Sequence, residues 1–218
     1  YAAPGSPEQA LHDLDPGAAT QLHQLAPRLE SSDTGAVVFS SPNASWAILP
    51  PFPVEHGQTI EGWDGSQLRS MLARDYVVGV VLIRLGRYAV GVFQGEVLVS
   101  SKTDTRYVKG RHSAGGTSQK RFARIREKQV QLIYEKTCLV AQQILSPYED
   151  RLDYILLGGE KFTLQGFRKE CPYIQGLSSK VLGRVLNVRE PNLAALKGCA
   201  STIWESRVVS MQSFDRLR

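Results

Sequence analysis

A glycine loop that runs into a basic helix contains the residues of this chain best suited to chemistry. Residues 109–128 read KGRHSAGGTSQKRFARIREK, which places Gly115 and Gly116 shortly before Gln119. Glycine lets a backbone adopt unusual angles and approach a substrate closely. The Gln119 amide does not titrate usefully, but it can both donate and accept hydrogen bonds. This pattern predicts a residue that positions a water molecule or stabilises a developing charge, rather than a general base.

The positive charge of the chain is concentrated around this loop. Positions 106–128 hold eight Lys or Arg and one acid, a net charge of +7, whereas the whole chain carries +5 and its remainder therefore −2. Such a local basic patch points to a polyanion, RNA or DNA. Acids are too few to pair these bases, so RNA contact is favoured over a solvated helix face. The predicted RNA-binding residues are Lys109, Arg111, His112, Lys120, Arg121, Arg124 and Lys128. For His112, an exposed histidine without a ligand is an equally good interpretation.

The remaining polar residues do not form a recognisable metal or nucleophile pattern. Asp33, Asp64 and Asp153 share neither a face nor a strand end, so no acidic cluster for two-metal chemistry is predicted. The four histidines lack metal-ligand spacing. The cysteines are three in number and have no CxxC spacing, which argues against a disulfide framework and against a zinc site. We therefore expect no metal and no cofactor.

Composition and cysteine usage indicate an ordinary globular protein of a reducing compartment. Apolar residues make up 42% of the chain and charged residues 22%. No apolar run reaches the length of a membrane-spanning helix, and no signal peptide is recognised. We expect a cytoplasmic protein without a membrane partner.

The order of the predicted elements indicates an α/β protein. Residues 1–34 predict a short helical extension, and 35–218 are taken as one domain. Strands are expected at 36–39, 45–49, 77–85, 88–94, 96–101, 152–157 and 181–188. Helices are expected at 66–73, from about 118 to about 145, after Gly158-Gly159 to about 170, and at 191–199. This order predicts a mixed β-sheet with helices on both faces.

The long helix is expected to bury one face and expose another. Its predicted apolar face contains Phe122, Ile125, Leu132, Ile133, Val140 and Ile144. The opposite face contains Lys120, Arg124, Lys128, Gln131 and Glu135, with Arg121 beside them. Farther along, Gly158-Gly159 predicts a tight strand-to-helix turn, because the further glycine or lysine of a phosphate loop is missing.

The loop and helix together carry a family resemblance. Gly115-Gly116-Thr117-Ser118-Gln119 followed by Arg121-Phe122-Ala123-Arg124 resembles the catalytic middle domain of archaeal and eukaryotic class I peptide chain release factors, which pair a Gly-Gly-Gln loop with such a helix. The runs at 154–159 and 177–182 are also similar to that domain. The likeness covers about residues 76 to 205. It implies a release-factor catalytic domain with RNase H-like topology.

Two differences from that pattern indicate which branch of the release factors this sequence resembles. Thr117 and Ser118 separate the glycines from the glutamine, and a stop-codon-reading domain and a partner-binding domain have no counterpart in the sequence. Both features resemble the Vms-like release factors, which act in ribosome rescue and quality control and have small actinobacterial members. The resemblance implies stop-codon-independent hydrolysis of peptidyl-tRNA on stalled ribosomes, with Gln119, Gly115 and Gly116 as the catalytic residues. It also implies that the partners are the large ribosomal subunit at its peptidyl-transferase centre, its ribosomal RNA, and peptidyl-tRNA.

Two other functions use the same residues. A nuclease that cuts the tRNA acceptor end would differ in its product, a shortened tRNA instead of an intact one. A non-enzymatic RNA-binding module would not need Gln119.

Overall fold

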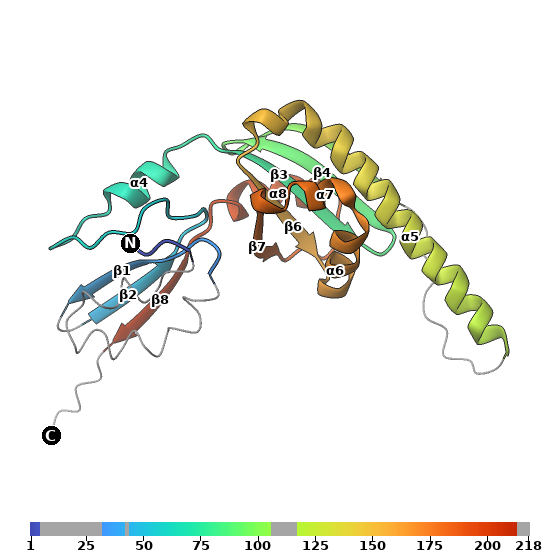
Figure 1. Cartoon of the computed structure of the whole chain (residues 1–218), viewed down its shortest axis with the longest axis horizontal. Coiled ribbons are helices and arrows are strands. Elements are labelled where there is room, and N and C mark those ends of the chain that lie inside the picture. Colours follow the sequence, from blue (N-terminus) through green and yellow to red (C-terminus); the bar gives the residue numbers. More distant parts are fainter. Residues whose placement is uncertain (5–31, 42–43, 106–116, 213–218) are drawn as a thin grey trace, which may run out of the picture. The chain divides into compact units, whose positions relative to one another are not determined.

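A computed structural model of the chain describes residues 1–4, 32–41, 44–105 and 117–212 (Figure 1). These residues form two compact units, Tyr1–Arg74 with Ile203–Arg218, and Asp75–Thr202. The predicted helical extension falls largely on residues 5–31, outside the described residues. The predicted single domain from 35 to 218 differs from this division, because the first two strands pair with the last strand rather than with the larger sheet.

The first unit contains a three-stranded antiparallel sheet. Its strand order is β1-β2-β8, with β1 (Val37–Ser41), β2 (Ala44–Leu49) and β8 (Arg207–Gln212), and it also holds the short helix α4 (Ser66–Leu72). Trp63, 65% exposed, stacks on Phe39 with ring centroids 5.1 Å apart. This unit joins segments from the two ends of the sequence.

The second unit is a five-stranded mixed sheet of order β5-β4-β3-β6-β7. Strands β3, β4 and β5 form an antiparallel meander, and β6 and β7 run parallel to β3. Their bounds are β3 (Val77–Arg84), β4 (Arg87–Gln94), β5 (Val97–Thr105), β6 (Tyr154–Gly159) and β7 (Val181–Leu186). The hydrophobic runs of β3 and β4 are buried because helices cover both faces of the sheet.

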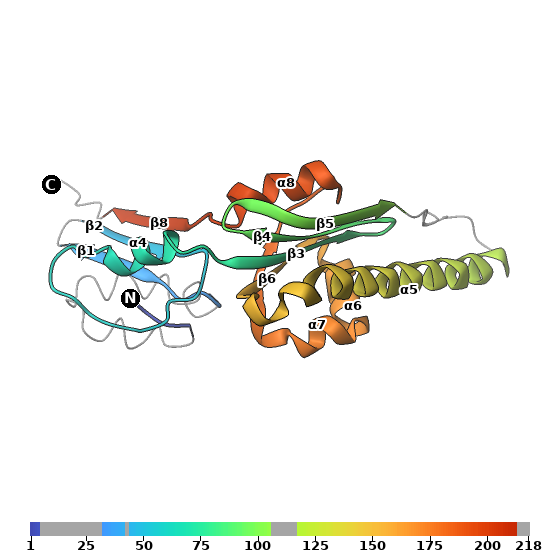
Figure 2. The ribbon, with the colours of Figure 1, turned by 90° about the horizontal axis from the view of Figure 1, so that it is seen from above.

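The helices of the second unit lie on both faces of this sheet, as predicted (Figure 2). One face carries α8 (Leu193–Thr202), which packs on β4 and β5. The other face carries the long helix α5 and the shorter helices that follow it. These elements are α5 (Thr117–Leu145), the 3-10 turn η1 (Ser146–Arg151), α6 (Lys161–Glu170), α7 (Pro172–Gly176) and the 3-10 turn η2 (Ser178–Lys180).

The turn from β6 into α6 requires glycine, which confirms the predicted strand-to-helix turn. Gly159 has a φ of +133°, and a Cβ atom there would collide with the carbonyl oxygen of Ile83 on β3. Glu160 then caps α6, accepting hydrogen bonds from the backbone N–H groups of Phe162 and Thr163 at 3.1 and 3.0 Å. The sheet therefore ends within one residue of the helix.

A disulfide joins α5 to the start of α7, contrary to the sequence prediction. Cys138 and Cys171 are bonded, with Cα atoms 5.3 Å apart and a sequence separation of 33. The absence of CxxC spacing misled the prediction, because only the packing of α5 on α6 and α7 brings these two cysteines together. Cys199 is free and buried, and burial raises the pKa of its thiol to about 11.

Candidate functional site

Helix α5 positions the predicted site by projecting past the sheet. Its 29 residues span about 43 Å at 1.5 Å per residue. The C-terminal half packs on the sheet and buries Ile133, Val140 and Leu145. In both views the N-terminal half extends beyond the sheet (Figures 1 and 2). The segment that follows the glycine loop is therefore held away from the body of the unit by a rigid helix.

The projecting half of α5 presents a basic face. Arg121, Arg124 and Lys128 are all exposed and are spaced three and four residues apart, so they lie on one side of the helix. Within the described residues, none of the three makes an ion pair with an acid. The predicted exposure of this face is confirmed, and its charge is open to a polyanion over about 10 Å of helix.

The predicted apolar face of α5 was wrong at two positions. Ile125 is 36% exposed and Leu132 is 52% exposed, and Leu139, seven residues farther on, is 56% exposed. The reason is tertiary. Ile125 lies in the half of α5 that projects past the sheet, whereas Leu132 and Leu139 each precede a buried residue and lie beside the line of the helix that the sheet covers. Arg126, the residue after Ile125, has a buried Nε that makes no hydrogen bond within the described residues.

Gln119 and Lys120 lie in the first turn of α5, since this helix begins at Thr117, one residue earlier than predicted. The first-turn N–H groups of a helix lack intrahelical acceptors, and this end of the helix dipole is positive. The Gln119 backbone is therefore placed where a phosphate or a developing oxyanion is favoured. The other predicted site residues, Lys109, Arg111, His112, Gly115 and Gly116, lie outside the described residues.

The opposite half of α5 borders a groove of about 810 Å³ with different chemistry. Burial, followed by the Glu149 carboxylate that accepts its hydrogen bond at 3.0 Å, raises the pKa of the Tyr173 hydroxyl in this groove. The groove combines apolar side chains with three carboxylates, and its lining comprises Glu135, Cys138, Leu139, Gln142, Glu149, Glu170, Pro172, Tyr173, Gly176 and Leu177. Its negative charge opposes phosphate binding. The basic and acidic surfaces of α5 are thus at opposite ends of the helix.

Two of the carboxylates considered for metal chemistry stabilise backbone instead. Asp64 accepts hydrogen bonds from the Ser66 N–H at 2.8 Å and from its hydroxyl at 3.0 Å, and these bonds lower the Asp64 pKa. Asp153 accepts from the Val77 N–H at 2.8 Å at the start of β3. Over the described ranges, no three His, Cys, Asp or Glu side chains gather as a metal site. Nor does any helix in those ranges combine the length and apolarity needed to cross a membrane.

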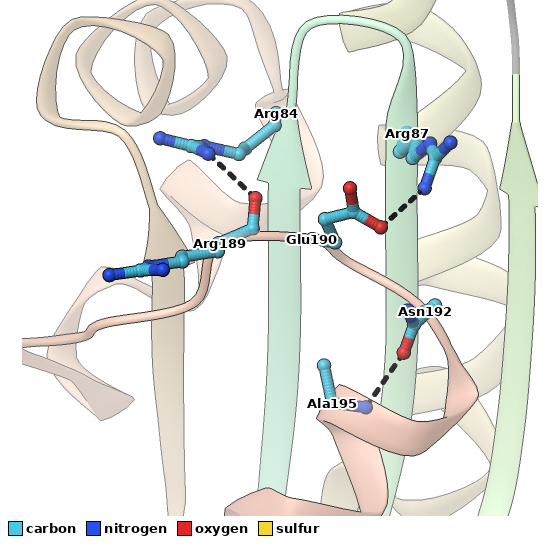
Figure 3. Close-up of polar contacts among 6 residues, drawn as sticks. All are labelled: Arg84, Arg87, Arg189, Glu190, Asn192 and Ala195. Atoms are coloured by element: carbon cyan, nitrogen blue, oxygen red, sulfur yellow. Dashed lines mark hydrogen bonds and ion pairs between the residues drawn. The ribbon is translucent and has the colours of Figure 1, made fainter.

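Sequence reasoning missed a second basic group, at an edge of the larger sheet (Figure 3). Arg84 ends β3 and Arg87 begins β4 across a tight turn, while Arg189 follows β7. The guanidinium of Arg84 donates to the Arg189 carbonyl oxygen at 2.6 Å. Because these positions are far apart in the sequence, only the strand order brings them together. The one local signal was the Arg84–Arg87 pair flanking a hairpin turn.

Comparison with known proteins places this geometry in a family. Residues 76–209, which include the whole sheet of the second unit and all of α5, match the family described as the actinobacteria/chloroflexi VLRF1 release factor. The chain belongs to this VLRF1 release-factor family. The matched range is close to the 76–205 over which the sequence resembled release factors, and the family confirms that resemblance.

Curated relatives of this VLRF1-family chain are archaeal. It is 34% identical over 116 residues to peptide chain release factor subunit 1 of Archaeoglobus fulgidus, covering 53% of this chain and 28% of that protein. It is 26% identical over 153 residues to the same factor of Aeropyrum pernix, covering 68% and 41%. The chain therefore spans less than half the length of these two relatives.

Two solved structures are also similar to this chain. The archaeal translation termination factor aRF1 has a TM-score of 0.43 at 16% identity, over 88% of this chain and 60% of that one. The Vms1 mitochondrial localization core has a TM-score of 0.42 at 11% identity, over 93% and 89%.

Proposed function

We propose that this chain hydrolyses peptidyl-tRNA on stalled ribosomes, releasing the nascent peptide through its Gly-Gly-Thr-Ser-Gln loop. The observation that supports this most is the placement of Gln119 in the first turn of a helix that projects past the sheet. The basic face of this helix makes no ion pair with any acid among the described residues. A catalytic group on such a projection can enter a narrow RNA-lined site while the body of the domain stays outside. Membership in a release-factor family points to the same reaction.

The proposed chemistry is the attack of water on an ester. The water oxygen bonds to the ester carbonyl carbon, the bond to the tRNA ribose oxygen breaks, and that oxygen leaves with a proton as a hydroxyl. The ester is intrinsically reactive, so the catalyst chiefly has to admit and orient the water. Gln119 would hold the water by its amide, and Gly115 and Gly116 would permit close backbone approach. No metal or cofactor enters this mechanism.

The basic face of α5 would act as a positioning surface. Arg121, Arg124 and Lys128 would bind phosphates of ribosomal RNA or tRNA, contacts that orient the protein without reading sequence. The proposed partners are the large ribosomal subunit, at its peptidyl-transferase centre, and peptidyl-tRNA, both in the cytoplasm. The proposed independence from a stop codon rests on the resemblance to Vms-like factors.

The test is a timed reaction of the purified chain with stalled ribosome–nascent-chain complexes, followed by gel analysis of both peptide and tRNA. We expect free peptide and intact tRNA. Gln119→Ala should abolish release while ribosome binding is retained. Gln119→Glu should also fail, because a carboxylate would repel RNA phosphates and the developing oxyanion.

Gln131→Ala provides a matched control, since Gln131 is an exposed glutamine on the same helix. It should release peptide at the wild-type rate. A shortened tRNA would establish the nuclease function in place of ester hydrolysis. Full release by Gln119→Ala would remove the catalytic assignment of Gln119. Ribosome binding without any release by the wild type would favour the RNA-binding module.

A further inference from the structure

The arginines at the carboxyl-end edge of the larger sheet form a group directed to one side (Figure 3). Arg84 and Arg189 extend their guanidinium groups in the same direction, and the Arg84 guanidinium is fixed by its 2.6 Å hydrogen bond to the Arg189 carbonyl oxygen. Among the described residues, neither makes an ion pair with a carboxylate. Arg87 differs from them, because it pairs with Glu190 at 2.8 Å.

Glu160, whose carboxylate interacts electrostatically with Arg84, is already engaged by other groups. Glu160 accepts hydrogen bonds from the Thr163 hydroxyl at 2.7 Å and from the backbone N–H groups of Phe162 and Thr163. The Thr163 hydroxyl, those N–H groups and, more weakly, the charge of Arg84 hold the pKa of Glu160 below its ordinary value. Its carboxylate is thus directed into the first turn of α6. Two neighbouring guanidinium groups without an acid between them are suited to bind an oxyanion.

An exposed aromatic residue, Phe162, lies in the first turn of the helix that follows the strand paired with the end of β3. Gly159 pairs with Ile83, so the first residues of α6 follow directly beside the end of β3. There Lys161 is exposed, and Phe162 is 75% exposed. An aromatic ring beside cations is the combination with which proteins stack bases and hold phosphates of single-stranded nucleic acid. A free phosphate ion has no base that could stack on the ring.

The strand register shows that the basic segment at 106–128 follows a strand that ends at this edge of the sheet. Arg84 pairs with Arg87, and Arg87 pairs with Thr105, the last residue of β5. The chain therefore leaves the sheet toward the glycine loop at the same edge that carries the arginine pair. An RNA that contacts the segment at 106–128 has a second cationic surface along this edge.

We propose that Arg84 and Arg189, with Lys161 and Phe162, form a second RNA-binding site, in which the arginine pair holds a phosphate and the ring stacks on a base. This inference rests on the proposed function only in taking RNA as the polyanion. Its readout is RNA binding rather than peptide release, so the failure of either idea can be recognised without the other.

The experiment measures anisotropy of a fluorescein-labelled single-stranded RNA titrated with the full chain over a series of KCl concentrations. R84A/R189A should weaken binding and lower the slope of log affinity against log salt by about 0.7, the value for one phosphate contact on a single strand. R168A/K169A removes two exposed charges from the last turn of α6 and is the matched control. It should leave the slope nearly unchanged.

Further variants measure how much each neighbouring side chain contributes to RNA binding. R189A alone preserves the carbonyl that fixes Arg84, so it tests the site without disturbing the backbone. R87A should have the smaller effect, since Glu190 already neutralises that charge. F162A should weaken RNA binding about five-fold or more through lost stacking. Equal affinities and slopes for R84A/R189A and R168A/K169A would overturn the proposal.

Inorganic phosphate serves as the second probe. If phosphate raised the thermal stability of the wild type but not of R189A, while RNA affinity was the same for both, the pair would bind a small anion and the RNA assignment would be wrong. If R189A lowered RNA affinity, the RNA assignment would be supported whether or not free phosphate also bound.

Discussion

The basic face of α5 allows a quantitative prediction about ribosome binding. Arg121, Arg124 and Lys128 are exposed on one side of a projecting helix and carry no acidic partner within the described residues. If each binds one RNA phosphate, their loss should lower the salt-dependence slope by about 0.7 to 0.9 per residue, or roughly 2 to 2.7 for all three. Over a fourfold rise in salt, wild-type affinity should then fall roughly 20- to 40-fold more than that of the variant.

The perturbation is R121Q/R124Q/K128Q, which removes charge while keeping side chains of high helix propensity. Binding to purified large ribosomal subunits would be measured by sedimentation over a KCl series, with circular dichroism as the check on folding. R168Q/K169Q/K197Q is the matched control, because it removes three exposed charges from α6 and α8 in the same unit. It should change the overall charge equally but the slope little.

Two results would contradict this prediction. If both triple variants shift the slope by the same amount, net charge alone governs binding and the α5 face has no special role. If neither variant changes the slope, the three side chains do not contact phosphate.

Further predictions concern stability and can be checked by urea unfolding followed by circular dichroism. Reducing the Cys138–Cys171 disulfide, which closes a loop of 33 positions, should lower the free energy of unfolding by about 4 kcal/mol, and an unchanged midpoint would contradict the bond. Gly159→Ala should cost about 2 kcal/mol or more, because its φ of +133° and a collision with a strand carbonyl both oppose a side chain. Gly198→Ala, in open space within α8, should instead stabilise by about 0.5 to 1 kcal/mol, and equal effects at the two glycines would refute this account. The lowered pKa of Glu160 means that its cap contributes fully above pH 4.5 and is lost as the pH falls through the folded-state pKa. Glu160→Gln should therefore cost about 0.5 to 1 kcal/mol at pH 7, and its difference from wild type should vanish in acid.

The local elements of the larger unit could be predicted from the sequence. Hydrophobic runs and turn residues located β3, β4 and β6, and helical periodicity located α5 to within one residue at its start. These features depend on neighbours in the chain, so they can be read without tertiary information. The same is true of the loop motif and of the charge at 106–128, which carried the family resemblance.

Strand β8 and the division into two units came only from tertiary structure. Residues 207–212 have weak strand periodicity, and they become a strand because β2 offers its edge over six residues. The paired positions are some 160 residues apart in the sequence, and local propensity does not specify which distant strand a segment pairs with.

Tertiary structure also decided which side chains of α5 are exposed and which distant groups meet. Ile125 and Leu132 have the periodicity of buried residues, yet they are exposed. Ile125 lies in the half of α5 that projects past the sheet, and Leu132 lies beside the line of the helix that Ile133 and Val140 bury. The Cys138–Cys171 bond and the Arg84–Arg189 pair likewise exist because separate elements pack together. Burial and contact are properties of surfaces brought together by folding, and a periodic pattern specifies only the surface that one element offers.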